Sequence, residues 1–390
     1  MLAVILAGGL GTRLKDVVSS VPKPMAPVDG RPFLFYILEL LKESGISDVL
    51  MLTGHKGEII EDYFQDGSDF GLSIRYSREP MALGTGGALF HAWSKLDEEF
   101  LLVNGDTIFD VQLPVLLDFV AREKSPACLA LRFTDDVSRF GTVEIDNRFS
   151  VLSFAEKGGF RPETVDGFIN GGISYFRKSA LLRYFAEFQG KPVSLENQVF
   201  PSLSREGELS GIPMGGRFLD IGIPSDYERC ASYIVPWLRM GRKPALFLDR
   251  DGVIIEDPGY VHGSDLTFME GNFERTRLAK EQGNHIIVVS NQAGIAKGKF
   301  SLRELELANA AIGTRYKERG MAIDRFYWCP YHPEGVIDTY KKVSLARKPQ
   351  PGMILRACEE FRIDIRNSTM IGDNGDVDRI LLPGLSCEIV

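Results

Sequence analysis

Short apolar runs alternate with amphipathic stretches along most of this chain. Runs such as Val4–Leu6 and Val49–Thr53 have the length of buried strands, whereas Phe33–Ser44 and Leu113–Glu123 place apolar residues at helical spacing. This alternation is typical of a mainly parallel sheet covered by helices, so we predict an α/β fold. The same pattern predicts further strands at Phe100–Asn104, Ala127–Phe133, Gly167–Phe176 and Gly207–Met214.

The alternation restarts near residue 245, after a predicted helix end at Trp237–Pro244. A new apolar strand, Ala245–Leu248, opens a second series. A chain of 390 residues also exceeds what one hydrophobic core usually organises. We therefore predict two α/β domains, 1–238 and 245–390, joined by a linker at 239–244. The second series comprises strands His285–Ser290, Ile323–Trp328 and Thr369–Ile371 and helices Leu302–Arg319 and Gly352–Glu360.

Composition narrows the class of partner. The net charge of −8 argues against nucleic acid or an anionic membrane as a partner, because phosphate contacts need clustered cations. The five cysteines are scattered and odd in number, which argues against a disulfide framework. No cationic leader precedes the first strand and no apolar run reaches membrane-spanning length. We expect a cytoplasmic protein that could form a homo-oligomer.

A glycine-rich loop follows the first strand. Gly8, Gly9 and Gly11 allow close backbone approach and can direct N–H groups at phosphate oxygens. A tight structural turn is the alternative for glycines alone. Two cations lie nearby in the sequence: Arg13, and Lys23, which stands between two prolines. They favour a loop that binds a triphosphate.

The segment Leu6–Leu14, with the Pro-Lys-Pro sequence around Lys23, resembles the sugar-1-phosphate nucleotidyltransferase family. The resemblance extends over about 230 residues. It implies that Arg13 and Lys23 act on the phosphates and that Lys157 orients the attacking sugar phosphate. It also implies Mg²⁺ on Asp106 and Asp220. Nucleotide or sugar contacts are implied for Leu6, Gly8, Gly9, Gly11, Thr12, Glu79, Gly84, Thr85, Asn104, Glu156, Asn170 and Gly171.

Single members of this set have simpler interpretations. Asp106 could cap a turn, Asp220 could pair with an arginine, and Lys157 could be a surface charge. Glu196 is either an acid near the sugar or a loop carboxylate. The chemistry favours the set as a whole, because two polyanions must be screened before one can attack the other in line.

A second motif, Asp249-Arg250-Asp251, ends the strand that opens the second series. One carboxylate can attack phosphorus while the other protonates the leaving alcohol and later activates water. Asp-x-Asp alone is also common in turns and metal sites. The preceding apolar strand and the following Gly252 favour the catalytic interpretation.

Downstream polar residues extend this motif. Ser290 and Asn291 end the next strand, Arg347 and Lys348 follow later, and Asp373 follows the last predicted strand. This order resembles the haloacid-dehalogenase phosphatase superfamily. The resemblance implies a nucleophile at Asp249, an acid/base at Asp251, phosphoryl binding by Ser290 and Lys348, and substrate contacts at Asn291 and Arg347. It implies Mg²⁺ on Asp249, Asp373 and the Asp251 carbonyl. For Asp378, a metal-site role and a helix N-terminal role are equally open.

Within this superfamily, 257–262, 291–300 and 329–333 resemble the heptose-1,7-bisphosphate 7-phosphatase group, a relative of the histidinol-phosphate phosphatases. That group commonly carries structural zinc. Here Cys329 is present, but Tyr331, Ser344 and Ala346 occupy the other ligand positions. One thiolate, with at most the adjacent His332, cannot fill a tetrahedral site, so we predict no structural zinc.

Together the motifs predict a bifunctional enzyme that removes one phosphate and activates another. The first domain is most similar to heptose-1-phosphate guanylyltransferases, which implies GTP and sugar phosphates as ligands. One alternative is a mannose- or glucose-type nucleotidyltransferase joined to a broad-specificity or histidinol-phosphate phosphatase. Another is a non-catalytic N-terminal module on an active phosphatase, since fold alone does not guarantee function.

Overall fold

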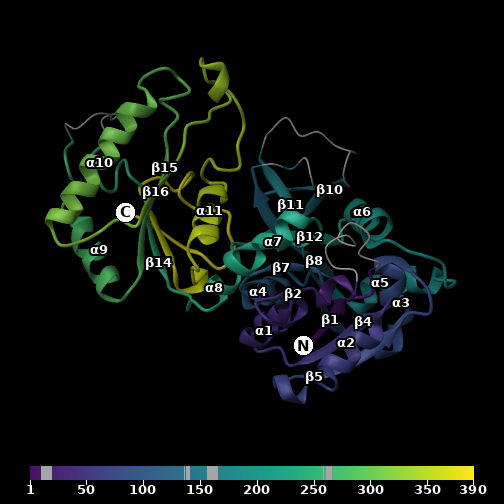
Figure 1. Cartoon of the computed structure of the whole chain (residues 1–390). Helices are drawn as coiled ribbons and strands as arrows, with labels where there is room; N and C mark the ends of the chain where they lie inside the picture. The colour runs from purple at the N-terminus through teal and green to yellow at the C-terminus, as the bar shows by residue number, and fades with distance from the viewer. Residues whose placement is uncertain (10–19, 136, 138–140, 156–165, 258, 261–265) are drawn as a thin grey trace. The chain divides into compact units, whose positions relative to one another are not determined.

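The computed structural model describes the chain except for residues 10–19, 136, 138–140, 156–165, 258 and 261–265 (Figure 1). The chain forms two compact units. The first contains Met1–Arg132, Val137–Phe160 and Phe168–Met240. The second contains Gly241–Val390 and two short earlier segments, Phe133–Asp136 and Arg161–Gly167. The predicted domain bounds, 1–238 and 245–390, stay a proposal beside these two units.

The first unit is built on a sheet whose core is four parallel strands in the order β6-β1-β4-β5. These strands are β1 (Leu2–Leu6), β4 (Asp48–Thr53), β5 (Ser73–Arg78) and β6 (Glu99–Asn104). β11 (Gly167–Arg177) runs antiparallel beside β6. The sheet is completed by β8 (Ala127–Thr134), β9 (Thr142–Ile145), β10 (Val151–Ala155) and β12 (Leu209–Pro213).

Helices pack on this sheet through apolar faces. Helix α1 (Phe33–Glu43) buries six apolar or aromatic side chains, among them Phe33 and Leu41, in the main core. Burial of this kind is the principal stabilising contribution to folding. The other helices are α2 (Gly57–Phe64), α3 (Gly84–His91), α4 (Leu113–Glu123), α5 (Lys178–Glu187), α6 (Phe200–Arg205), α7 (Pro224–Tyr233) and α8 (Val235–Leu238).

Small ribbons and short helices complete this unit. β7 (Thr107–Phe109) pairs antiparallel with β13 (Phe218–Asp220), and this pairing sets Thr107 opposite Asp220. A π-helix spans Leu195–Val199. The remaining short elements are β2 (Pro27–Val28), β3 (Arg31–Pro32) and the 3₁₀ helices η2 (Lys23–Met25), η3 (Ser68–Phe70) and η4 (Trp93–Lys95).

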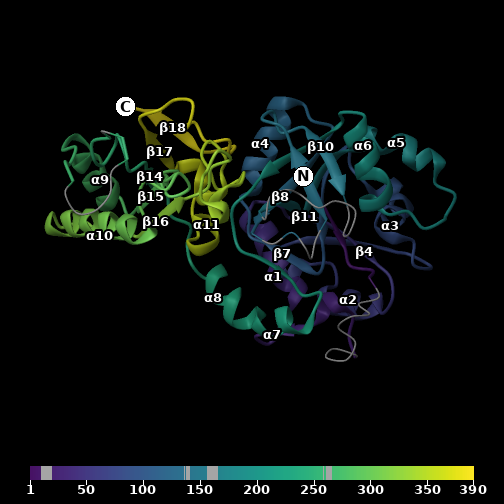
Figure 2. The same cartoon turned by 90° about the horizontal axis from the view of Figure 1, so that it is seen from above.

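The second unit contains a parallel sheet in the order β16-β15-β14-β17-β18. Helices α9 and α10 lie on one side of this sheet and α11 on the other (Figure 2). The central strand, β14, is buried at all four positions. The strands are β14 (Ala245–Leu248), β15 (His285–Asn291), β16 (Arg325–Cys329), β17 (Thr369–Gly372) and β18 (Ser386–Ile389); the helices are α9 (Gly271–Glu281), α10 (Leu302–Glu318), α11 (Gly352–Glu360), η6 (Asp338–Tyr340) and η7 (Ile365–Asn367).

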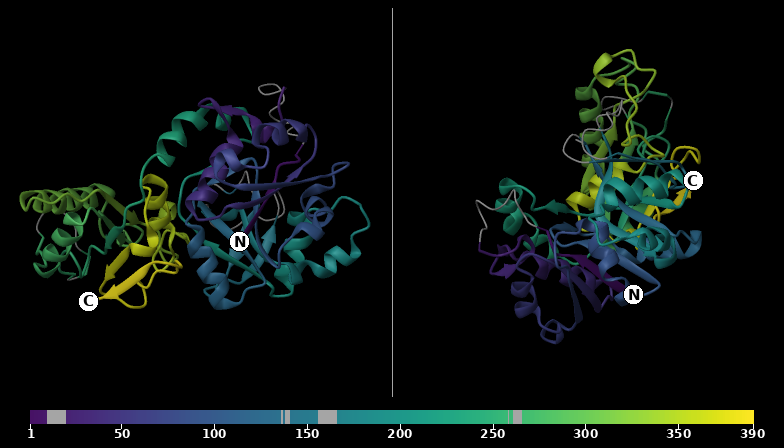
Figure 3. Two further views of the ribbon diagram at one scale, coloured as in Figure 1. Left: turned by 90° about the horizontal axis from the view of Figure 1, so that it is seen from below. Right: turned by 90° about the vertical axis from the view of Figure 1, so that its right-hand side faces the viewer.

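The architecture confirms the predicted α/β class in both units. The chain begins in the first unit and ends in the second (Figure 3). Strand β18 escaped prediction because it lies at a sheet edge, where three of its four residues are exposed and the sequence lacks an apolar run. Among the described residues, no helix is both long enough and apolar enough to span a membrane.

Candidate active sites

The carboxyl ends of the parallel strands of the first unit meet at one edge of the sheet. Gly8 follows β1, Gly54 follows β4, Glu79 follows β5 and Asp106 follows β6. In open α/β sheets this edge is the usual place for ligands. The fold therefore brings four separate segments of the sequence to one candidate site.

Lys23, Asp106 and Asp220, three of the residues predicted for the first site, meet at this edge. The Lys23 ammonium donates to Asp106 Oδ2 at 2.7 Å and to Asp220 Oδ1 at 3.4 Å. Asp106 lies beside Thr107, which is opposite Asp220 in the β7–β13 ribbon. The pairing of these two short strands is thus what brings the two carboxylates together.

The two carboxylates are arranged to share a cation. Burial raises the pKa of Asp220, and the nearby charge of Asp106 raises it further. A cation between the two groups lowers the pKa of Asp220 again, and Lys23 supplies such a charge here. Two oxygen donors at the end of a sheet also fit Mg²⁺, which prefers one or two carboxylates and keeps several waters.

Glu79 lies against the glycine loop. A Cβ added at Gly8 would come within 2.8 Å of Glu79 Oε1, and one added at Gly54 within 2.7 Å. These glycines therefore leave the space that the carboxylate occupies. Glu79 Oε2 accepts the Leu83 N–H at 3.0 Å, and burial raises the pKa of Glu79.

A turn on β11 closes on the end of β6. Asn170 Oδ1 accepts the Gly172 N–H at 3.1 Å, and Gly172 has a φ of +80°. A Cβ at Gly172 would lie 3.1 Å from the Asn104 amide, and one at Gly171 would collide with Phe109. The structure therefore brings Asn104, Asn170 and Gly171 together, and their contact with a sugar stays a prediction.

Gly84 and Thr85 have partners that the sequence did not indicate. A Cβ at Gly84 would lie 2.6 Å from the Val193 carbonyl oxygen, and the backbone there has a φ of +75°. Thr85 Oγ1 donates to Glu196 Oε2 at 2.7 Å and accepts the Leu195 N–H at 2.9 Å. These two residues hold the 193–196 segment, and a direct nucleotide contact by either stays a prediction.

Leu6 and Gly9 are the remaining predicted residues of this edge that the structure describes. Leu6 ends β1 beside Asn104, and Gly9 has open space where a side chain would start. Gly11, Thr12, Arg13, Glu156 and Lys157 lie outside the described residues. Their roles remain those that the resemblance implies.

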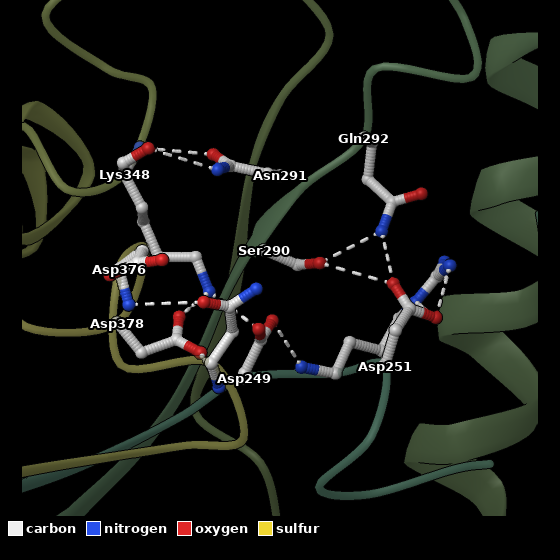
Figure 4. A network of polar contacts seen from close by, with 10 residues as sticks. Asp249, Asp251, Ser290, Asn291, Gln292, Lys348, Asp376 and Asp378 are labelled. Carbon is white, nitrogen blue, oxygen red and sulfur yellow. Dashed lines mark hydrogen bonds and ion pairs between the residues drawn. The ribbon is translucent and has the colours of Figure 1, made fainter. Parts of the chain in front are cut away.

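The second candidate site lies at the carboxyl end of β14 (Figure 4). Asp249 Oδ1 accepts the Arg250 N–H at 2.7 Å, and its Oδ2 lies 2.7 Å from the Lys348 ammonium. Burial raises the pKa of Asp249 to about 6, while Lys348 opposes that rise. Asp249 is thus a buried carboxylate held in its charged form by one lysine, as a nucleophile requires.

Asp251 points to a different set of groups from Asp249. Its Oδ2 accepts Gln292 Nε2 at 2.7 Å and faces the Ser290 hydroxyl at 3.4 Å. Its Oδ1 accepts two guanidinium N–H groups of Arg250, at 2.8 and 3.0 Å. The two aspartates therefore have distinct environments, which suits a nucleophile and a separate acid/base.

Three carboxylates gather beside Lys348. Oxygens of Asp249, Asp373 and Asp378 lie within 4.8 Å of one another, and this is the only such acidic cluster among the described residues. Asp378 is fully buried and accepts the Lys348 ammonium at 2.6 Å. A Cβ at Gly372 would collide with Asp378. The donor set fits a hard oxygen-loving ion such as Mg²⁺.

These groups line a cavity of about 220 Å³. Its wall includes Tyr260 and Phe300 in addition to the aspartates. Asn291 is bound to the main chain of Lys348 in both directions, at 3.0 and 3.1 Å. Arg347 has one buried guanidinium nitrogen without a hydrogen-bond partner among the described residues. Asn291 thus contributes to the site by holding the main chain of Lys348. Arg347, in contrast, has a guanidinium N–H that is available to a ligand.

The predicted absence of structural zinc stays a prediction. Cys329 is buried, and burial raises the pKa of its thiol, which opposes the thiolate that zinc needs. Ser344 and Ala346 are also buried. Metal analysis of the purified protein is the direct test.

Sequence reasoning missed Arg250 and Gln292 as site residues and left Asp378 undecided. Arg250 could have been noticed as a charged residue between two aspartates at the end of a buried strand. Gln292 directly follows Ser290 and Asn291, but a glutamine carries no motif of its own. The role of Asp378 could not be decided from the sequence, because its contact with Lys348 joins residues thirty positions apart.

We expect Asp378→Asn to lower phosphatase kcat by about 100-fold and to raise the Mg²⁺ concentration needed for half-maximal rate. The substitution removes a buried charge that both balances Lys348 and belongs to the acidic cluster. The matched control is Asp376→Asn, which alters an exposed neighbour outside that cluster. Mg²⁺ titrations of both variants check the prediction, and equal behaviour of the two would contradict it.

The two sites define a nucleotidyltransferase and an aspartate phosphatase. The chain belongs to the nucleotidyl transferase family, whose model matches residues 2–235, and its C-terminal part to the HAD-like hydrolases, whose model matches 345–380. It therefore carries a nucleotidyltransferase activity and a phosphatase activity.

Three known proteins illustrate the similarity. The D-glycero-alpha-D-manno-heptose 1-phosphate guanylyltransferase of Campylobacter jejuni is 38% identical over 58% of this chain and 97% of its own length. The D-glycero-beta-D-manno-heptose-1,7-bisphosphate 7-phosphatase of Vibrio cholerae is 44% identical over 34% of this chain and 73% of its own length. The crystal structure of HddC from Yersinia pseudotuberculosis complexed with GMP-PN matches this structure with a TM-score of 0.51. The match has 31% sequence identity and covers 59% of this chain and 98% of the HddC chain.

Proposed function

We propose that this enzyme carries out two consecutive steps of nucleotide-activated heptose synthesis. It removes the 7-phosphate of D-glycero-D-manno-heptose 1,7-bisphosphate. It then joins the resulting heptose 1-phosphate to GMP from GTP, which gives GDP-heptose and pyrophosphate. The observation that carries this proposal is that one chain combines a relative of a heptose-bisphosphate phosphatase with a relative of a heptose 1-phosphate guanylyltransferase.

Dephosphorylation uses the residues around Asp249. Its carboxylate attacks the 7-phosphorus, an aspartyl-phosphate forms, and the bond to the sugar oxygen breaks. Asp251 protonates that oxygen and later takes a proton from the water that hydrolyses the aspartyl-phosphate. Ser290 and Lys348 bind the phosphoryl oxygens during both steps. Mg²⁺ held by Asp249, Asp373 and the Asp251 carbonyl, with Asp378 in the same acidic cluster, would supply positive charge to the same oxygens.

Nucleotidyl transfer uses the edge formed by β1 and β6. The 1-phosphate of the sugar attacks the α-phosphorus of GTP, and pyrophosphate leaves. Backbone N–H groups at Gly8 and Gly9 and the Lys23 ammonium would neutralise the phosphates, which must approach each other in line. Mg²⁺ on Asp106 and Asp220 would screen both anions. Asn104 and the Asn170 turn would hold the sugar.

Glu79 supports guanine as the base. A carboxylate repels phosphates, so we assign it to the nucleoside. Its Oε1 lies beside Gly8, so we place the base next to the loop that holds the phosphates. Guanine presents an N1–H and a 2-amino group side by side, and a carboxylate can accept both.

We therefore expect Glu79→Gln to lower kcat/KM for GTP by about 10- to 100-fold. The loss should be smaller with inosine triphosphate, which lacks the 2-amino group, so the preference for GTP over it should shrink. Glu58→Gln, at an exposed site on α2, is the control. An unchanged ratio in Glu79→Gln would remove Glu79 from base selection.

The two relatives differ in the anomer that their names specify, alpha for the guanylyltransferase and beta for the phosphatase. Removal of a 7-phosphate leaves C1 untouched, so consecutive steps in one chain require a single anomer. Phosphate release should be measured with both anomers of the 1,7-bisphosphate, and nucleotidyl transfer with both anomers of the 1-phosphate. One shared anomer supports the proposal, whereas opposite preferences, or faster transfer to mannose 1-phosphate, would contradict it.

A further inference from the structure

The turn that carries Lys348 is held by a residue from much earlier in the chain. Asp166 belongs to the Arg161–Gly167 segment of the second unit and is 2% exposed. Its Oδ2 accepts the Ser344 hydroxyl, and its Oδ1 accepts the Leu345 N–H at 3.2 Å. The partners lie 178 and 179 positions further along the chain. A buried carboxylate with two protein donors fixes both of them in place.

The turn itself is a compact set of hydrogen bonds centred on Ser344. Its hydroxyl oxygen accepts the Ala346 N–H at 3.1 Å, and its carbonyl accepts the Arg347 N–H at 3.1 Å. The Leu345 carbonyl accepts the Gly352 N–H at 2.8 Å, where α11 begins. A Cβ at Gly352 would lie only 2.6 Å from that carbonyl oxygen. The turn is therefore closely packed, and displacement of Ser344 would be passed to Arg347 and Lys348.

Lys348 depends on this turn for its position. Its main chain is paired with Asn291 on one side, and its buried ammonium reaches Asp249 at 2.7 Å and Asp378 at 2.6 Å. In contrast to an exposed lysine, this one has little freedom to correct a main-chain shift by changing side-chain conformation. The ammonium is thus aligned from two sides, by Asn291 and by the Asp166-bound turn.

We propose that Asp166 is a positioning residue for the phosphatase reaction. It acts through Ser344 and Leu345, which set the main chain that leads to Lys348. The role is one of hydrogen-bond geometry, because both partners are neutral donors. Without the carboxylate, the Ser344 hydroxyl and the Leu345 N–H lose their partner inside the protein and the turn must shift to satisfy them.

The test compares Asp166→Ala with Asp166→Asn in the full-length protein. The alanine variant should lower phosphatase kcat by about 10- to 100-fold, the effect expected from a misplacement of about 1 Å, with KM changed less than about threefold. Asparagine should restore kcat to within about threefold, because its oxygen can accept the Leu345 N–H while its amide donates to the Ser344 oxygen.

Two further variants separate positioning from folding. Asp135→Asn is the matched control, since it removes an ion pair with Arg356 on α11 within the same unit and should leave kcat unchanged. Ser344→Ala removes the bond to Asp166 and the Ala346 N–H bond to the same hydroxyl but keeps the Leu345 N–H bond to Asp166, so it should also lower phosphatase kcat. The losses from Ser344→Ala and Asp166→Ala should be less than additive in the double variant, because the two residues share one bond. If Asp166→Ala does not fold, Ser344→Ala tests the proposal instead, and an unchanged phosphatase kcat in that variant would overturn it.

Three results would overturn the proposal. The first is an unchanged kcat in Asp166→Ala. The second is an asparagine variant as slow as the alanine variant, which would assign the effect to charge. The third is a loss of activity equal to the fraction of unfolded protein in thermal unfolding, which would leave Asp166 a purely structural residue.

Discussion

Asp249→Asn should abolish phosphate release, by at least about 10⁴-fold, and leave nucleotidyl transfer within about twofold of the unaltered enzyme. The amide keeps the shape of the side chain but cannot form the aspartyl-phosphate. It also removes one charge from the pair with Lys348, so the site loses its nucleophile and part of its electrostatic balance together. The measurement is release of inorganic phosphate from the bisphosphate, with nucleotidyl transfer assayed on the same preparation.

The control for this variant is Asp257→Asn. Asp257 lines the same cavity but lies outside the acidic cluster. We expect it to keep phosphate release within about tenfold. Turnover by Asp249→Asn at more than about 1% of the normal rate would show that Asp249 is not the nucleophile. At that rate the variant would have lost less than about 3 kcal/mol of transition-state stabilisation.

The reciprocal variant, Asp106→Asn, should lower nucleotidyl transfer by about 10³-fold and leave phosphate release unchanged. Asp106 is bound by Lys23 and lies beside Asp220, so its charge is needed wherever a cation is to be shared between the two carboxylates. The expected signature is a fall in kcat that added Mg²⁺ corrects only in part. Pyrophosphate release with GTP and heptose 1-phosphate provides the measurement.

Asp97→Asn, an exposed aspartate just before β6, is the matched control for Asp106→Asn. It should transfer GMP at the normal rate. If Asp106→Asn lowered both activities without a change in thermal unfolding, the two-site account would be wrong, because the residue would then act on a shared catalytic centre.

Much of this arrangement could be predicted from local sequence. Buried strands with apolar runs, such as β1 and β14, are marked by composition, and catalytic groups follow directly after them. Since parallel strands end at a common edge, the sequence also predicts that Asp106 lies near the glycine loop and that Asp249 lies near Ser290. These predictions need only strand positions and direction.

What the sequence could not provide depends on contacts between distant positions. Asp378 joins Lys348 by a bond across thirty residues, and Asp166 joins Ser344 across 178. The Thr85 hydroxyl joins Glu196 and Leu195, more than a hundred residues away, a pair of contacts that the sequence did not indicate. A carboxylate or hydroxyl can serve any of several partners, and only the folded chain selects one.

The most direct test of the central claim is phosphorus NMR of the full-length protein with heptose 1,7-bisphosphate, Mg²⁺ and GTP in one tube. The account predicts loss of the 7-phosphate signal, appearance of inorganic phosphate, and then the paired signals of a pyrophosphate diester. Asp249→Asn should produce no inorganic phosphate, and Asp106→Asn should stop at heptose 1-phosphate. Loss of the 7-phosphate without any diester from the unaltered enzyme, at either anomer, would contradict the account.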